Sequence, residues 1–126
     1  MSRTIIAVVD DLFFASKIRG TGEHLGVRVQ FIKSISDAVA KAREEVPALL
    51  IVDLNARCCD ATELARALKA DDNLNGIPLL GFFSHIQTEL HQAALAAGFD
   101  RVMPRSAFTR NLAEILSGNE RSEPSA

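Results

Sequence analysis

Three aspartates of the sequence stand where buried β-strands are expected to end. Asp10 and Asp11 directly follow an apolar run over residues 5–9, and Asp53 directly follows a second apolar run over residues 48–52. Short runs of branched apolar residues are typical of strands that are buried on both faces of a parallel sheet. Because neighbouring parallel strands end at the same edge of a sheet, we expect the three carboxylates to gather there.

Carboxylates gathered in this way repel each other unless a cation binds between them or one of them keeps its proton. A hard divalent ion such as Mg²⁺ prefers carboxylate and water oxygens, so it suits such a cluster. An ionised aspartate beside the ion can attack a phosphoryl group and form an acyl phosphate. The simpler alternative is that Asp10 and Asp11 only cap the following helix and that Asp53 only begins a loop. All three acids meeting at one edge favours a functional site.

The elements that would position these acids alternate along the chain. Strands are predicted over residues 4–9, 27–31, 48–52, 77–83 and 101–103. The predicted helices cover residues 12–25, 35–46 and 61–70, a segment between Ser84 and Gly98, and a single last helix that contains Phe108, Leu112, Ile115 and Leu116. This alternation with short links indicates a parallel sheet with helices on both faces.

Turn and capping residues set the expected ends of these helices. Ser34 or Ser36 can cap the second helix, whose apolar face would extend to Val46 before Pro47 stops it. The fourth helix would be opened by Ser84, which is spaced with Gln87 as a capping box. In the first helix, Gly20 and Gly22 are expected to weaken the structure, each by about 1 kcal/mol relative to alanine.

The predicted fold class is α/β, a flavodoxin-like (βα)5 doubly wound parallel sheet in three layers. The first, third and fourth strands are the most apolar and are expected in the centre, which gives the strand order 2-1-3-4-5. The ligand crevice of that order lies between the carboxyl ends of the first and third strands, where Asp10, Asp11 and Asp53 are expected. One domain over residues 1–117 is predicted, followed by a disordered polar tail over residues 118–126.

Composition narrows the classes of function. The net charge of the 126 residues is −2 and there is no basic run, so we expect no nucleic-acid partner. No apolar stretch approaches the length of a membrane span, and no signal peptide is recognisable, so a cytoplasmic protein without membrane contact is expected. No glycine-rich phosphate loop follows the first strand, which argues against a flavin or nucleotide site.

The cysteines and histidines do not have the spacing of known site motifs. Cys58 and Cys59 are adjacent, so they form no ordinary disulfide framework and lack the CxxC spacing of redox or zinc sites. We interpret them as inert residues of a loop or helix start. His24, His85 and His91 show no ligand spacing and are interpreted as surface residues.

The acidic motifs resemble those of the CheY-like receiver domain of bacterial two-component response regulators. The resemblance rests on residues 8–11, Val-Val-Asp-Asp, and residues 50–55, Leu-Ile-Val-Asp-Leu-Asn, and it extends over nearly the whole chain. It implies that Asp53 accepts a phosphoryl group from a histidine kinase or a phosphotransfer protein. It also implies that Asp10, Asp11, Asp53 and the backbone carbonyl of Asn55 bind Mg²⁺.

Other positions depart from the pattern of that family. The hydroxyl residue that usually ends the fourth strand is replaced by Phe83, and Ser84 follows one residue later. A one-residue bulge in the strand would restore Ser84 to the site, and otherwise its side chain need not face it. Arg105 stands in place of the usual lysine and could hold a phosphoryl group, or could pair with Asp53 and make a metal dispensable. Val102 replaces a common aromatic residue.

The sequence therefore predicts a divergent stand-alone receiver domain that accepts a phosphoryl group at Asp53 with the help of Mg²⁺. Only a short tail follows the last helix, so signalling is expected through contacts with a downstream protein, at the fourth helix, fifth strand and last helix. The alternative is a pseudo-receiver, a protein-binding module that never carries phosphate. Arg105 and Phe83 favour this alternative, whereas the intact acids oppose it. A metal-dependent hydrolase lacks a candidate general base.

Overall fold

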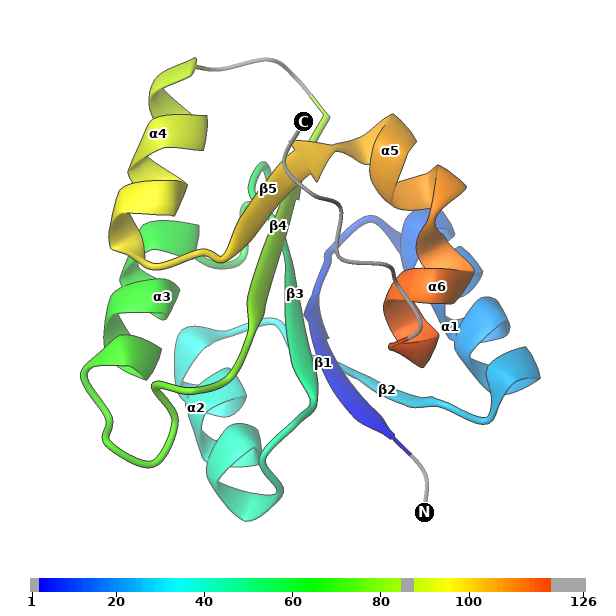
Figure 1. The fold of residues 1–126 in the computed structure, drawn as a ribbon, viewed down its shortest axis with the longest axis horizontal. Helices are drawn as coiled ribbons and strands as arrows, with labels where there is room; N and C mark the ends of the chain where they lie inside the picture. The colour runs from blue at the N-terminus through cyan, green and yellow to red at the C-terminus, as the bar shows by residue number, and fades with distance from the viewer. Residues whose placement is uncertain (1–2, 85–87, 119–126) are drawn as a thin grey trace.

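A computed structural model describes residues 3–84 and 88–118 of the chain (Figure 1). Its elements are β1 (Thr4–Val8), α1 (Leu12–Leu25), β2 (Arg28–Phe31), α2 (Ile35–Glu44), β3 (Leu49–Asp53), α3 (Ala61–Lys69), β4 (Leu79–Phe83), α4 (Thr88–Ala97), β5 (Arg101–Pro104), α5 (Arg105–Arg110) and α6 (Leu112–Ser117). All neighbouring strands are parallel, and their order in the sheet is β2-β1-β3-β4-β5. The predicted flavodoxin-like topology is confirmed.

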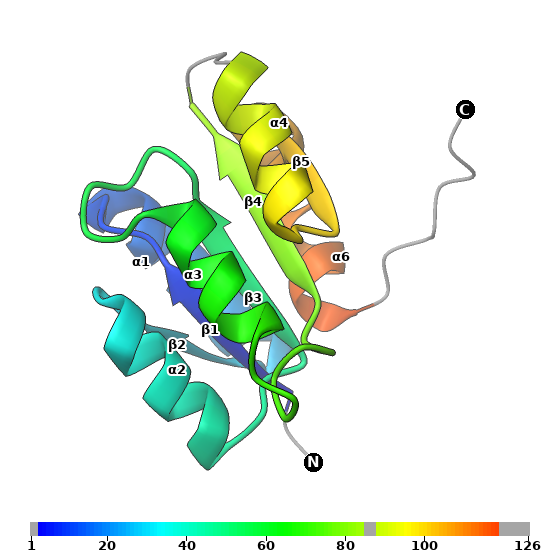
Figure 2. The same ribbon diagram turned by 90° about the vertical axis from the view of Figure 1, so that its left-hand side faces the viewer.

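Helices cover both faces of the sheet and complete the three layers. Figure 1 shows α1, α5 and α6 on one face and α2, α3 and α4 on the other, and Figure 2 looks onto the second of these layers. Alternate residues of β1 point to opposite faces, so Ile6 and Val8 pack with the α2–α3–α4 layer, whereas Ile5 and Ala7 pack with the α1–α5–α6 layer. Each apolar run thus contributes alternate residues to two hydrophobic cores, one on each face of the sheet.

Burial separates the central strands from the edge strands. Every residue of β1 and β3 is buried, whereas no residue of β2 or β5 is fully buried. The strand pairing runs without interruption from Leu50 opposite Leu79 to Asp53 opposite Phe82, and β4 pairs equally regularly with β5. Strand β4 therefore contains no bulge, and the bulge that would have restored Ser84 to the expected position is not formed.

Glycine has a packing role in α1 that the sequence analysis did not anticipate. The helix runs unbroken through Gly20 and Gly22 to the left-handed Gly26. A Cβ atom added to Gly22 would lie 3.1 Å from the carbonyl oxygen of Val27 and 3.1 Å from a methyl carbon of Val29. Gly22 thus allows α1 to approach the chain that enters β2, which offsets its low helix propensity.

Two predictions about helices are wrong in detail. Helix α2 is capped by Ser34 and ends at Glu44, so Val46 lies beyond it and is 57% exposed instead of extending its apolar face. The single last helix is divided at Asn111, whose side-chain amide donates a hydrogen bond to the Ala107 carbonyl at 3.0 Å. The Asn111 N–H also bonds that carbonyl, at 3.1 Å, but the Asn111 backbone (φ −106°, ψ 15°) leaves helical geometry, in line with the low helix propensity of asparagine.

Some predictions fall outside the part of the chain that the structure describes. The capping box needs Gln87, and the proposed tail over residues 118–126 is described only at Gly118, which ends α6 in the left-handed conformation. The single domain over residues 1–117 remains a prediction. Within residues 3–84 and 88–118, no helix is long and apolar enough to cross a membrane.

Candidate functional site

The carboxyl edge of β1 and β3 holds the three aspartates that the sequence analysis selected. The two strands are neighbours, with Val8 opposite Val52, so Asp10 and Asp11 follow one strand where Asp53 ends the other. Asp53 is only 6% exposed, and it is the one buried carboxylate among the described residues. The topology thus brings the acids to one edge, as predicted from the two apolar runs.

Asp53 differs from the other two acids in its burial. Its Oδ1 accepts a hydrogen bond from the Asn55 N–H at 2.9 Å, which favours the ionised form. Burial acts in the opposite direction and is the largest influence on its pKa, and the negative charges of Asp10 and Asp11 add to it. The net result is a pKa above the ordinary value for an aspartate. The site therefore contains more negative charge than its surroundings compensate.

Asp10 holds the loop that follows β3 through two hydrogen bonds. Its Oδ2 accepts hydrogen bonds from the N–H groups of Arg57 at 2.9 Å and Cys58 at 3.3 Å. These are bonds between residues far apart in the sequence, so the position of the loop depends on the carboxylate of Asp10. The simpler interpretation, in which Asp10 only caps α1, does not describe these contacts.

Asp11 has two contacts with different consequences. Its Oδ1 accepts the Phe14 N–H at 3.1 Å and caps α1, so the capping role that the simpler interpretation gave this residue is present, although it is not the only one. Its Oδ2 lies 3.1 Å from Nη2 of Arg105. The capping bond, followed by the contact with Arg105, lowers the pKa of Asp11, so this acid is held in its ionised form.

Arg105 links the acids to the hydrophobic core. Its guanidinium carbon lies 3.9 Å from the ring centroid of Phe14, a cation–π contact. Phe14 in turn packs against Phe82 and Phe108, whose rings are stacked with centroids 4.6 Å apart. The ion pair of Arg105 is with Asp11, so the suggested pairing of Arg105 with Asp53 is not the one formed.

The residues at the end of β4 are arranged differently from the simplest expectation. The Phe83 ring packs toward α4, with its centroid 5.6 Å from the ring of His91. The Ser84 N–H donates a hydrogen bond to Oδ1 of Asn55 at 2.7 Å, and its hydroxyl lies 3.5 Å from Nη1 of Arg105. Ser84 therefore borders the site without a bulge. The sequence analysis considered only the backbone carbonyl of Asn55 and missed the role of its side chain.

Solved structures of receiver domains share this arrangement of elements. No protein-family model matches the sequence, and no curated protein matches it. The signal receiver domain of a response regulator from Bermanella marisrubri matches with a TM-score of 0.79 and 22% identity, over 94% of this chain and 98% of that chain. The phosphorylated cyanobacterial phytochrome response regulator RcpA matches with a TM-score of 0.77 and 21% identity, over 99% of this chain and 100% of that chain.

This chain has the fold of response regulator receiver domains. A further match is the receiver domain of a sensor histidine kinase from Pseudomonas aeruginosa, which holds a magnesium ion coordinated in its active site cleft. Its TM-score is 0.75 at 20% identity, over 94% of this chain and 99% of that chain. At 20–22% identity, these matches establish the fold of this chain. The roles of its residues are argued from the geometry of the site.

The carboxylate oxygens at the edge of this receiver fold are of the type that binds a hard cation. Three carboxylates share one edge, and their mutual repulsion contributes to the raised pKa of Asp53. Among the described residues, however, no three histidine, cysteine, aspartate or glutamate side chains are grouped closely enough to hold a metal ion. Asp11 is engaged by Arg105 and by the end of α1, so it would have to leave Arg105 to join Asp10 and Asp53 around an ion.

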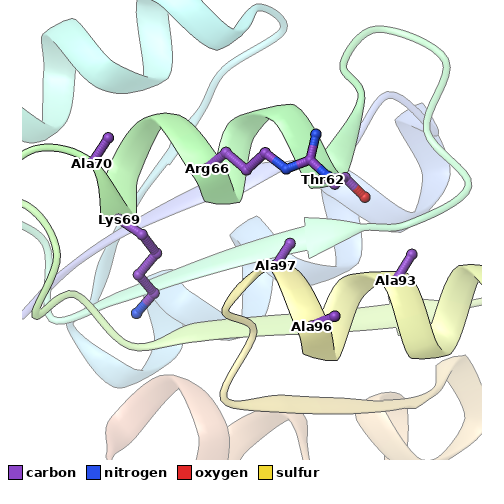
Figure 3. Close-up of a pocket in the computed structure, with 7 residues that line it drawn as sticks. All are labelled: Thr62, Arg66, Lys69, Ala70, Ala93, Ala96 and Ala97. Carbon is purple, nitrogen blue, oxygen red and sulfur yellow. The ribbon is translucent and has the colours of Figure 1, made fainter.

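A groove between α3 and α4 lies apart from the acids. It has a volume of about 440 Å³ and is lined by Thr62, Arg66, Lys69, Ala70, Ala93, Ala96 and Ala97 (Figure 3). The Lys69 ammonium donates a hydrogen bond to the Asn75 carbonyl at 3.2 Å. None of the three aspartates lines this groove, so the chemistry of the acid edge does not use it.

Proposed function

We propose that this protein is a receiver domain of a two-component phosphorelay and that Asp53 accepts the phosphoryl group. The observation that carries the proposal is the position of Asp53, buried at the carboxyl edge of β3 beside Asp10 and Asp11, in a chain with the receiver fold. A carboxylate oxygen of Asp53 would attack phosphorus and form a P–O bond. The bond from phosphorus to the donor breaks, and the donor leaves with the electron pair.

The side chains around Asp53 fit this reaction. Arg105 already lies at the edge through its contact with Asp11, and its planar guanidinium can donate two parallel hydrogen bonds to phosphoryl oxygens. The Ser84 hydroxyl borders the site, 3.5 Å from Nη1 of Arg105, and would add at most a weak donor. The raised pKa of Asp53 means that the attacking carboxylate becomes available as pH rises above that value.

Magnesium is the cofactor that the donor set suits. Asp10, Asp11, Asp53 and the backbone carbonyl of Asn55 would hold it. Bound Mg²⁺ would offset the negative charge that the carboxylates share with the incoming phosphoryl oxygens. The contribution of the protein is to keep Asp10 and Asp53 in place through the Arg57 and Asn55 N–H groups.

An exposed apolar pair supports a protein as the phosphoryl donor. Leu12 and Phe13 begin α1 directly after Asp11, and they are 72% and 91% exposed. Large apolar side chains beside a polar site are a common feature of protein-binding surfaces. We propose a histidine kinase or a phosphotransfer protein as donor, a further protein as downstream target, and the cytoplasm as location.

The test is intact-mass spectrometry after incubation with acetyl phosphate and Mg²⁺. We expect one phosphoryl adduct on the wild type and none on Asp53→Asn, because the amide cannot attack phosphorus. Asp60→Asn is the matched control, since Asp60 caps α3 outside the site and its variant should still be labelled. A folded wild-type protein that gains no phosphoryl group in excess donor would refute the proposal.

The pseudo-receiver remains the second candidate because two contacts favour it. Arg105 occupies Asp11 with its own positive charge, and Phe83 packs toward α4 where a hydroxyl residue was expected. Such a module would bind its partner equally well whether or not a phosphoryl donor is present. The same labelling experiment therefore separates the two functions.

A further inference from the structure

The adjacent cysteines in the loop between β3 and α3 have no part in the proposed function. The Sγ atoms of Cys58 and Cys59 are 3.3 Å apart, and both cysteines are free thiols. Cys58 is half-buried, whereas Cys59 is buried in the core cluster that includes Leu54 and Leu64. The pair thus offers one thiol that solvent can reach and a second thiol directly behind it.

A direct disulfide is a poor product for this pair. Adjacent Cα atoms are about 3.8 Å apart across a trans peptide, whereas disulfides usually join Cα atoms about 4.4–6.8 Å apart. The geometry of adjacent residues therefore opposes a direct bond between the two sulfurs.

We propose that Cys58 and Cys59 form a dithiol site for a soft trivalent centre of the arsenical class. An atom bound to both sulfurs spans the gap between them without a sulfur–sulfur bond, and soft centres prefer sulfur ligands. With an arsenic(III) oxide, two As–S bonds form and the bond from arsenic to oxygen breaks. The oxygen leaves with the two thiol protons as water. Arsenic stays trivalent and no oxidant is needed.

The dithiol site is connected to the acid edge through the backbone. The N–H groups of Arg57 and Cys58 both donate hydrogen bonds to Oδ2 of Asp10. A ring closed through arsenic would fix the side-chain rotations of Cys58 and Cys59, so the peptide groups that hold Asp10 would have to adapt. Occupation of the site should therefore be detectable at Asp10.

The test uses phenylarsine oxide with the full chain. We expect one phenylarsenic adduct by intact mass, with loss of one water and of both free thiols. The adduct should survive excess glutathione, a monothiol, and be removed by 2,3-dimercaptopropanol, a dithiol. In glutathione, Cys58→Ser and Cys59→Ser should each bind the probe roughly a hundredfold more weakly, because the second bond forms within the molecule.

Two results would overturn the proposal. One is a single variant that keeps its adduct in glutathione as the wild type does, because one sulfur would then suffice. The other is a wild type whose thiols stay free in excess probe. Circular dichroism checks the folding of the variants, and the reversal by dithiol needs the wild type alone. Amide NMR shifts at Arg57 and Cys58 test the connection to Asp10, and unchanged shifts would refute it. Phosphorylation of Asp53 enters none of these measurements.

Discussion

The two ends of the carboxyl edge of this sheet are built in different ways. The acid half, Asp10, Asp11 and Asp53, follows directly from where β1 and β3 end. The β4–β5 half comprises Phe83, Ser84 and Arg105, and its ion pair with Asp11 joins residues 94 positions apart in the sequence. Its residue types also depart from those of the receiver family, whereas those of the acid half match it. The half that holds the proposed acceptor thus keeps the residue types of that pattern, and the departures gather in the other half.

Arg105 connects the two halves through an ion pair. It begins α5 in the β4–β5 half, and its ion pair is with Asp11 in the acid half. It also lowers the pKa of Asp53, against the larger opposing effect of burial. Substitutions in and around the two halves measure how far the halves are independent, beginning with the largest expected effect.

The largest effect is expected at two neighbouring residues of β4 that face opposite layers. Phe82→Ala removes a buried ring stacked on Phe108, so we expect a loss of about 3–5 kcal/mol in the free energy of unfolding. Phe83→Ala removes a partly exposed ring beside His91, and the loss should stay below about 2 kcal/mol. Urea unfolding at constant pH measures both. Equal losses would mean that Phe83 is as deeply packed as Phe82.

The next effect concerns the competition between Arg105 and a metal ion. Arg105→Met frees Asp11 from its ion pair, so we expect tighter Mg²⁺ binding, by roughly tenfold, which corresponds to about 1.4 kcal/mol. Isothermal titration calorimetry or amide NMR measures the affinity. Arg110→Met removes the same charge from the exposed end of α5 and is the matched control. If both variants gain equally, only net charge matters, and the specific link between the halves is disproved.

A third effect is the opposite response of Asp53 and Asp11 to pH. Because its folded pKa is raised above 3.8, Asp53 makes the folded chain bind more protons than the unfolded chain between 3.8 and that pKa. Its contribution to stability is complete below pH 3.8 and is lost as pH rises through the folded pKa. Asp53→Asn should therefore become more stable relative to the wild type as pH rises through this window.

For Asp11 the sign is reversed because its folded pKa is lowered below 3.8. Its contribution is present above pH 3.8 and is lost as pH falls through the folded pKa. Asp11→Asn should therefore be less stable than the wild type at neutral pH, with the difference shrinking in acid. Thermal unfolding of both variants at a series of pH values is the measurement. Parallel curves would show that the two acids share one environment.

The smallest effect is expected for the hydroxyl of Ser84. Ser84→Ala removes a contact of 3.5 Å with Arg105, at the limit of a hydrogen bond, and keeps the N–H that bonds Asn55. We expect the free energy of unfolding to change by less than about 0.5 kcal/mol. The lifetime of the phosphoryl group on Asp53 should also change little. A lifetime altered severalfold would show that Ser84 contacts the phosphoryl group and that the β4–β5 half is more complete than its contacts suggest.

The sequence was sufficient for the fold because the informative signals were local. The apolar runs of β1 and β3, each ending in aspartate, predicted central strands and placed the acids at one edge. The alternating run over residues 27–31 predicted an edge strand, and β2 is one. A strand buried on both faces is apolar throughout, and a strand buried on one face alternates. Each pattern can be recognised in the strand's own sequence, without knowing which strands pair with it.

The contacts that distinguish this site could not be predicted in the same way. Arg105 and Asp11 are 94 residues apart in the sequence, so no spacing rule joins them, and Asp53 was an equally reasonable partner. The hydrogen bond from the Ser84 N–H to the Asn55 side chain depends on the end of β4 in three dimensions. The division of the last helix did have a signal, since Asn111 is a poor helix former.

The contact between Arg105 and Phe14 connects the acid edge to the hydrophobic core, where NMR can detect a change at that edge. The ring of Phe14 is shared between the guanidinium and the rings of Phe82 and Phe108. The chain has no tryptophan or tyrosine, so these phenylalanines carry its magnetic anisotropy in this region. Ring currents from the trio shift the methyl resonances of neighbouring aliphatic side chains. A displacement of Arg105 by metal or phosphate would therefore be readable in the methyl spectrum of residues that never touch either ligand.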